Sequence, residues 1–217
     1  GMLAAARLAA ALHAELAARL VSDTRVADAV AFADLARHKH SASPLGALLR
    51  RAEASLRRTV AALAEREHAA WSFEVVECVG VLAAGGGIES EDLVAIELSR
   101  LEVAMSDLRD EVASALEHAR GVLLFPASDH PRNGQIAVIG ATPPGPPIVA
   151  IAKDIAETLR APLGVLHGAD VGGVANAVRK RNPALVVVDA ADPLAHALLA
   201  RPRFLRELAT PLLLLKP

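Results

Sequence analysis

The stretch Gln135-Ile-Ala-Val-Ile-Gly-Ala-Thr-Pro-Pro-Gly-Pro-Pro-Ile148 opens the segment of the sequence that decides the fold. After Gln135, four aliphatic residues form a run typical of a buried strand, and Gly140 with the prolines that follow ends this strand in a turn. Aliphatic residues at three- and four-residue spacing then predict a helix, whose apolar face would carry Ile148, Ile151, Ile155 and Leu159.

The same alternation continues to Pro217. Helices are expected around 171–180 and after Asp192-Pro193, because Asp caps a helix N-terminus and Pro fits its first turn. Short apolar strands that alternate with amphipathic helices predict a parallel, doubly wound sheet with right-handed crossovers. Further aliphatic runs predict three more strands, at 163–167, 184–188 and 211–216. The last helix would bury Leu194, Leu198, Leu205 and Leu208.

Composition excludes several classes of protein. A formal charge of −2 gives no electrostatic reason to expect nucleic acid as a partner, and 2% aromatic residues leave few platforms for stacking bases. Cys78 is the only cysteine, so no intrachain disulfide can form and a reducing compartment is expected. No apolar run reaches the length of a membrane span and no signal peptide is evident, which predicts a cytoplasmic protein without membrane contact.

The first half is longer and less regular. Residues 2–21 fit either one alanine-rich helix, which propensity favours, or a helix to about His13 followed by a strand from Glu15 to Val21. Ser22-Asp23-Thr24 offers a cap for a helix to about His38, and Pro44 opens a long helix to about His68. Strands are then predicted at 71–79, 92–96 and 121–125, with a helix over 101–119 before the last of them.

An internal duplication is suggested by the ends of the two halves. Residues 92–126 and 184–217 each read as a buried strand, an amphipathic helix and a short apolar strand. Turn-forming residues are concentrated between Pro126 and Asn133. We therefore predict a domain over 2–126, a linker over 127–134 and a shorter domain over 135–217.

At this point the sequence resembles a known family, the universal stress proteins, in the form where two such domains share one chain. The segment Ile136-Ala-Val-Ile-Gly-Ala-Thr142 followed by a helix and Ala161-Pro-Leu-Gly-Val-Leu-His167 is similar to that family's opening strand, helix and second strand. Trp71-Ser-Phe-Glu-Val-Val76 after an arginine-rich helix is similar to a later segment of the family. The resemblance implies an α/β fold with two doubly wound parallel-sheet domains in tandem, of the adenine nucleotide α-hydrolase-like type, and a role in the stress response.

Compared with the family pattern, both predicted domains lack elements. The first lacks the opening strand before its first helix, and the second has no room between His167 and Ala184 for a long middle helix and a third strand. Each of the two sheets is therefore expected to hold about four strands.

The resemblance also implies a degenerate nucleotide site. Family members that bind ATP carry an Asp at the end of the first strand and glycines after the fourth, where backbone amides approach the phosphates. Here Gly140 takes the place of the Asp, and the segment Asp189-Ala-Ala-Asp192 has no glycine. Acidic side chains at that place would repel phosphates.

The leading hypothesis is a module without catalytic activity that acts through dimerisation or protein interaction. In this family the closing strand lies at the sheet edge and pairs across a two-fold axis, and an apolar edge needs a partner. The closing strands could pair within one chain as a pseudo-dimer, or two chains could form a homo-oligomer. The matching residues are Val122, Leu123, Leu124 and Phe125 in the first half, and Leu212, Leu213, Leu214 and Leu215 in the second.

The alternative is a stress sensor that binds ATP, another adenine nucleotide or a small ligand at the carboxyl ends of the second-half strands. His167 would lie near two carboxylates there, which could shift its proton affinity. The lining would be Gly140, Ala141, Thr142, Pro143, His167, Asp189 and Asp192.

An enzyme is not expected. The sequence has no Gly-x-Ser-x-Gly elbow for a hydrolase, and the prolines in Gly140-Ala-Thr-Pro-Pro-Gly145 remove amides that a dinucleotide fingerprint needs. His38 and His40 point apart on a helix end and have no carboxylate or cysteine close by in sequence, so we predict no metal site.

Overall fold

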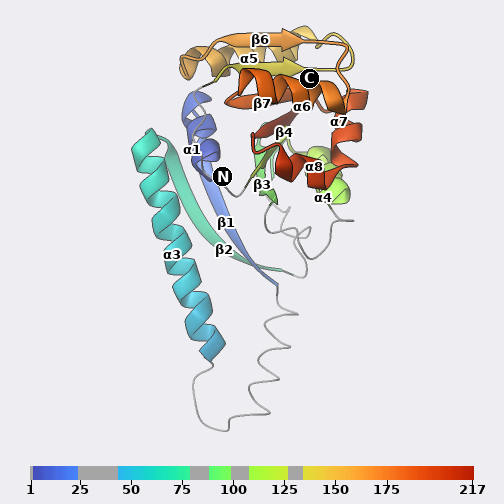
Figure 1. The fold of residues 1–217 in the computed structure, drawn as a ribbon. Coiled ribbons are helices and arrows are strands. Elements are labelled where there is room, and N and C mark those ends of the chain that lie inside the picture. Colours follow the sequence, from blue (N-terminus) through green and yellow to red (C-terminus); the bar gives the residue numbers. More distant parts are fainter. Residues whose placement is uncertain (1, 24–43, 79–87, 99–107, 127–133) are drawn as a thin grey trace.

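A computed structural model describes residues 2–23, 44–78, 88–98, 108–126 and 134–217 (Figure 1). The predicted helix at 24–38, the pair His38 and His40, and most of the predicted linker lie outside these ranges. The first half contains α1 (Met2–Ala11), β1 (Glu15–Asp23), α3 (Pro44–Glu67), β2 (Ala70–Cys78), β3 (Leu93–Glu97), α4 (Leu108–His118) and β4 (Gly121–Phe125). The second half contains β5 (Ile136–Ile139), α5 (Pro146–Thr158), β6 (Leu163–Leu166), α6 (Val171–Arg181), β7 (Leu185–Asp189), α7 (Pro193–Leu199), α8 (Pro202–Glu207) and β8 (Leu212–Leu215).

A six-stranded sheet forms the centre of the molecule, in the order β3-β4-β8-β7-β5-β6. All neighbours are parallel except β4 and β8, which are antiparallel. The sheet therefore takes strands from both halves of the chain. The expectation of about four strands in each of two sheets is wrong: the pairing of β4 with β8 joins strands of both halves into one sheet of six, and β1 and β2 form a separate parallel pair.

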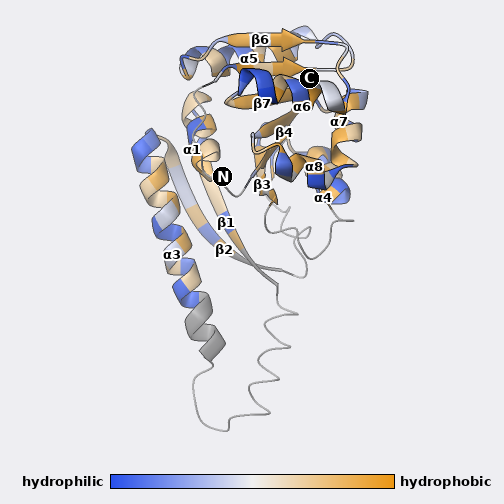
Figure 2. Ribbon diagram, in the orientation of Figure 1, coloured by the Kyte–Doolittle hydropathy of each residue, from blue (hydrophilic) through white to orange (hydrophobic). Residues whose placement is uncertain are grey.

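Helices cover both faces of the six-stranded sheet, as the both-sided apolar strands predict. On one face α1 and α5 pack against alternate strand residues such as Leu123, Val187 and Leu213. On the other face α4, α6, α7 and α8 pack against the residues in between, such as Val122, Val188 and Leu214. Figure 2 shows the strands of this sheet as predominantly hydrophobic, whereas the coloured part of α3 alternates between hydrophilic and hydrophobic residues.

The pairing of β4 with β8 is symmetric about its centre. Leu123 pairs with Leu213 at the centre. On one side Val122 pairs with Leu214, and on the other side Leu124 pairs with Leu212, so each strand presents the same sequence of positions to the other. The same equivalence follows from the parallel neighbours, because Val94 pairs with Val122 on one side and Val186 pairs with Leu212 on the other.

The turns that follow α1, α3 and α5 have one geometry. One residue of each turn, His13, His68 or Arg160, lies in the left-handed region with φ of 53°, 60° and 52°. In each turn the next amide returns to the helix: Ala14 N donates to Ala9 O at 2.9 Å, Ala69 N to Ala64 O at 2.9 Å and Ala161 N to Ala156 O at 2.8 Å. This is a common way to end a helix, and here it leads into β1, β2 and β6.

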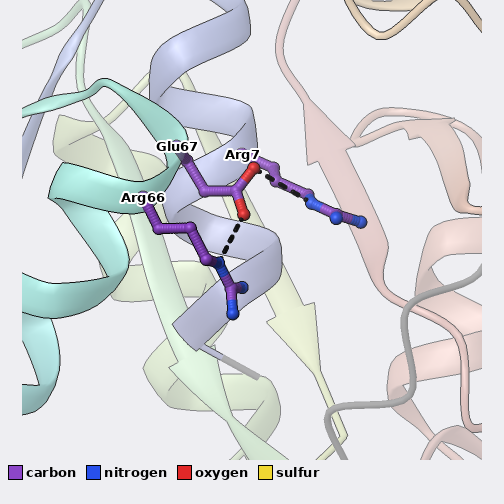
Figure 3. Close-up of polar contacts among 3 residues, drawn as sticks. All are labelled: Arg7, Arg66 and Glu67. Atoms are coloured by element: carbon purple, nitrogen blue, oxygen red, sulfur yellow. Dashed lines mark hydrogen bonds and ion pairs between the residues drawn. The ribbon is translucent and has the colours of Figure 1, made fainter.

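The β1–β2 pair is joined to the rest of the molecule through α1 and α3. The two helices contact each other, and Arg7 Nε of α1 donates to Glu67 Oε2 of α3 at 3.2 Å while Arg66 Nε donates to Glu67 Oε1 at 2.9 Å (Figure 3). Val60 and Ala64 of α3 are buried, whereas Arg57 and Arg58 are exposed, so this helix is amphipathic.

Two sequence questions are settled by the structure. Residues 2–21 form a helix and then a strand, because β1 gains β2 as a hydrogen-bonding partner and Leu16 packs on the core, which outweighs alanine helix propensity. The single helix expected after Asp192 is wrong: it is divided into α7 and α8. Pro202 lacks an amide hydrogen and restricts the residue before it, and Arg201 accordingly lies at φ −129°, ψ 64°.

The fold class is α/β with a sheet that is mostly parallel, as predicted. Among the helices that the structure describes, none is long and apolar enough to span a bilayer.

Candidate functional site: a closed anion cradle at Asp192

The candidate site lies where β5 and β7 end. These strands are neighbours and parallel, so their carboxyl ends meet at one edge of the sheet. The chain leaves β5 through Gly140, Ala141 and Thr142, and it leaves β7 through a turn that leads to Asp192, the N-cap residue of α7. The sequence thus brings three backbone amides and a carboxylate together across the sheet edge.

The Asp192 carboxylate accepts four hydrogen bonds. Its Oδ1 accepts from Ala141 N at 3.0 Å and from Leu194 N at 2.8 Å. Its Oδ2 accepts from Thr142 N at 3.1 Å and from the Thr142 hydroxyl at 2.8 Å. Together these donors form the kind of cradle in which proteins bind small anions, and here the anion is a side chain of the same chain.

Asp192 is one of two buried polar residues among the described residues, with 5% of its surface exposed. Burial raises the pKa of its carboxyl, but hydrogen bonds from Leu194, Thr142 and Ala141 together outweigh burial and hold the pKa below its ordinary value. The carboxylate is therefore charged at neutral pH and satisfied by its own donors.

Gly140 is required mainly by the tight turn that follows β5, and Asp192 of the neighbouring loop also lies close to it. A Cβ atom at this position would lie 2.6 Å from the Thr142 carbonyl oxygen and 3.1 Å from Asp192 Oδ2. The resemblance implied an Asp at this position, and the geometry shows that even an alanine would press on the backbone. Gly140 N donates instead to Leu166 O at 3.0 Å, and Gly140 O accepts from Ala169 N at 3.1 Å.

The remaining residues of the predicted lining lie differently. Asp189 caps its own turn, with Oδ1 accepting from Ala191 N at 2.8 Å. His167 and Pro143 are exposed. Within the described parts of the chain, no hydrogen bond or ion pair joins His167 to Asp189 or Asp192.

The sequence predicted Asp192 both as the cap of a helix and as an acidic residue at the degenerate nucleotide site, but it did not connect the two roles. It missed the bonds to Ala141 and Thr142, which lie about 50 residues away in sequence. The signal that could have found them is the pairing of Gly140 with Asp192, since a residue without a side chain leaves room for a carboxylate from the neighbouring loop.

The predicted closing-strand residues form a second candidate site. Val122, Leu123 and Leu124 of β4 pair with residues of β8, and all eight predicted residues are buried. Phe125 pairs with Glu97 of β3 and lies beyond the β4–β8 register. The two closing strands therefore satisfy each other's edges within one chain. In the described ranges no group of three or more His, Cys, Asp or Glu residues could hold a metal ion.

Comparisons with known proteins identify the fold. A universal stress protein from Archaeoglobus fulgidus DSM 4304 superimposes with a TM-score of 0.53 at 10% identity, over 93% of this chain and 85% of that chain. The chain has the universal-stress-protein fold. A functionally unknown protein from Pseudomonas aeruginosa PAO1 gives a TM-score of 0.48 at 13% identity, over 94% of this chain and 92% of the other. No protein-family model and no curated protein matches the sequence.

Proposed function

We propose that this chain is a tandem universal-stress-protein-like module that has lost its nucleotide site and acts without catalysis, through contacts with other proteins. The observation that carries this proposal is the Asp192 carboxylate in its cradle. A phosphate group bound in the same cradle would need the amides of Ala141, Thr142 and Leu194, which already donate to Asp192. Its negative charge would also be repelled by Asp192 and Asp189.

The same contacts support a role without catalysis. A general base needs a carboxylate that can reach a substrate proton, and all four donors around Asp192 come from the protein itself. The lowered pKa of Asp192 also argues against a role as general base, because a weaker base accepts protons less readily at neutral pH.

The tandem organisation is supported by the symmetric register about Leu123 and Leu213 and by the equivalent parallel neighbours of β4 and β8. In this interpretation β4 and β8 form the two-fold contact of a pseudo-dimer inside one chain. Their edges are then unavailable to a second chain, so contacts with other proteins use other surfaces.

Isothermal titration calorimetry with ATP, ADP, AMP and inorganic phosphate tests the proposal. We expect no saturable heat with the wild-type protein. The Asp192→Ala variant leaves three amides without their acceptor, and we expect it to gain phosphate binding, whereas Asp189→Ala serves as a matched control that leaves the cradle filled.

Saturable binding of ATP to the wild-type protein would overturn the proposal and favour the nucleotide-sensing alternative. An Asp192→Ala variant that folds but gains no anion binding would show that the carboxylate is not what closes the cradle.

A further inference from the structure

Two histidines occupy the same position in two neighbouring turns of the first half. His13 lies between α1 and β1, and His68 lies between α3 and β2. Both residues are exposed, and both lie in the left-handed region, with φ of 53° and 60°. The Asp192 cradle is built entirely from second-half residues, so neither histidine belongs to it.

The register of β1 and β2 places the two turns side by side. Glu15 pairs with Ala70 at the start of these parallel strands. Each histidine stands two residues before a member of that pair, so His13 and His68 are aligned across the two strands. The two histidines are far apart in sequence, and the pairing of the strands is what brings them together.

The two turns also have the same backbone conformation. Each histidine N–H donates back into its own helix, His13 N to Ala10 O at 3.2 Å and His68 N to Glu65 O at 3.3 Å. Because matched turns on parallel strands have their Cα–Cβ bonds in similar directions, the two imidazole groups leave the backbone on the same side of the β1–β2 pair.

The helices before the turns are in contact as well. α1 packs against α3, and Glu67, the residue before His68, accepts a hydrogen bond from Arg7 Nε of α1 at 3.2 Å (Figure 3). Paired strands lie about 5 Å apart and packed helices about 8–10 Å apart, so the backbones of the two turns are separated by a distance between these values. Two imidazoles can span such a gap with one metal ion, since each metal–nitrogen bond adds about 2 Å to their reach.

We propose that His13 and His68 bind one divalent transition metal ion of the kind that favours imidazole ligands, such as Ni²⁺, Cu²⁺ or Zn²⁺. In the described ranges no third His, Cys, Asp or Glu completes a group of three with them, so water fills the other coordination positions. A site with so many water ligands binds less tightly than a structural zinc site, and we expect a Kd on the order of 10–100 µM.

A metal ion at this place joins the core to the β1–β2 pair. Leu16, which follows His13 in β1, packs against the core of the six-stranded sheet. His68 instead leads from α3 into β2, which lies outside that sheet. The ion is therefore a second link between the two parts, beside the partly exposed Arg7–Glu67 ion pair.

Isothermal titration calorimetry of the full chain with NiCl₂ tests the proposal, and we expect one ion per chain. His13→Asn and His68→Asn each remove one imidazole, and asparagine tolerates the left-handed region, so the turns should be kept. Each variant should raise the Kd by about tenfold or more. The matched control is His118→Asn at the exposed end of α4, which should leave the Kd unchanged.

Electron paramagnetic resonance counts the ligands directly, with less than one equivalent of CuSO₄ as the probe. We expect two imidazole nitrogens on the ion in the wild type and one in either single variant. In NiCl₂ at about 100 times the Kd, the Tm of the wild type should rise by about 4 °C or more, and that of the two variants should rise less.

Three results would overturn the proposal. Two ions per chain, one lost with each histidine, would show that His13 and His68 bind separately. An unchanged Kd in either single variant would show that the site does not need both. Loss of the two-nitrogen signal in the His38→Asn/His40→Asn double variant, with the signal kept in His13→Asn, would assign the ion to another part of the chain.

Discussion

Replacing Asp192 by asparagine tests the cradle with the smallest possible change. The side chain keeps its shape, but one carboxylate oxygen becomes an amide group that donates hydrogen bonds. If the amide faces Thr142, the backbone amide of Thr142 loses its acceptor, while the Thr142 hydroxyl can turn and accept. If the amide faces the other way, Ala141 N and Leu194 N both lose theirs, so the first orientation is preferred.

The magnitude follows from that orientation. A hydrogen bond to a charged group contributes about 1.5–3 kcal/mol, and an unsatisfied buried donor costs a similar amount. Thr142 is exposed, so water reaches part of the site and the lower end of the range applies. We expect Asp192→Asn to lower the free energy of unfolding by about 2 kcal/mol, which corresponds to roughly 4–8 °C in Tm for a chain of this length.

The pH dependence has a definite sign. Because the folded-state pKa of Asp192 lies below its unfolded value, the carboxylate contributes stability above the unfolded pKa of about 3.9 and loses it as the pH falls through the folded pKa. The variant has no carboxyl to titrate at this position. The difference in unfolding free energy between the two proteins should therefore be constant near neutral pH and should shrink below about pH 4.

Urea unfolding followed by circular dichroism measures this difference at each pH. The matched control is Asp189→Asn, whose carboxylate accepts only the Ala191 amide among the described donors, and we expect it to cost about 1 kcal/mol or less. If Asp192→Asn is as stable as the wild type, or if the two Asp→Asn variants lose equal stability, the cradle does not hold the loops together.

Three further substitutions test other parts of the structure by urea unfolding. Gly140→Ala should cost about 2 kcal/mol because its Cβ would meet the Thr142 carbonyl at 2.6 Å, whereas Gly145→Ala should cost about 0.5 kcal/mol or less. Equal losses would contradict the tight turn at Gly140. Leu213→Ala, at the centre of the β4–β8 pair and fully buried, should cost about 2–5 kcal/mol, and Val165→Ala about 0.5 kcal/mol or less; a tolerated Leu213→Ala would argue against that pairing. Glu67→Gln should cost less than about 1 kcal/mol because the Arg7–Glu67 pair is partly exposed, and the loss should fall with added salt; a larger loss that salt leaves unchanged would contradict this.

Much of the fold could be predicted because the strands of the six-stranded sheet have a clear sequence signature. Runs such as Leu212–Leu215 are aliphatic on both faces and are bounded by Pro or charged residues, so few other structures suit them. The start of a helix at Asp192-Pro193 could also be predicted, because a helix cap depends only on residues close together in sequence.

What could not be predicted depends on contacts between distant residues. Residues 2–21 favour one helix by composition, and the family resemblance favours a helix followed by a strand; the pairing with β2 decides between the two. The bonds from Ala141 and Thr142 to Asp192 join loops that are adjacent only once β5 and β7 pair. The sequence shows that acidic residues stand near the site, but not that one of them fills it.

The most direct measurement of a closed cradle is the position of the backbone amide resonances of Ala141, Thr142 and Leu194 in a ¹H–¹⁵N spectrum, recorded with and without millimolar ATP. A cradle occupied by Asp192 predicts that these three resonances stay unchanged at every ATP concentration. Saturable shifts of all three would show that a phosphate displaces the carboxylate and would contradict the account.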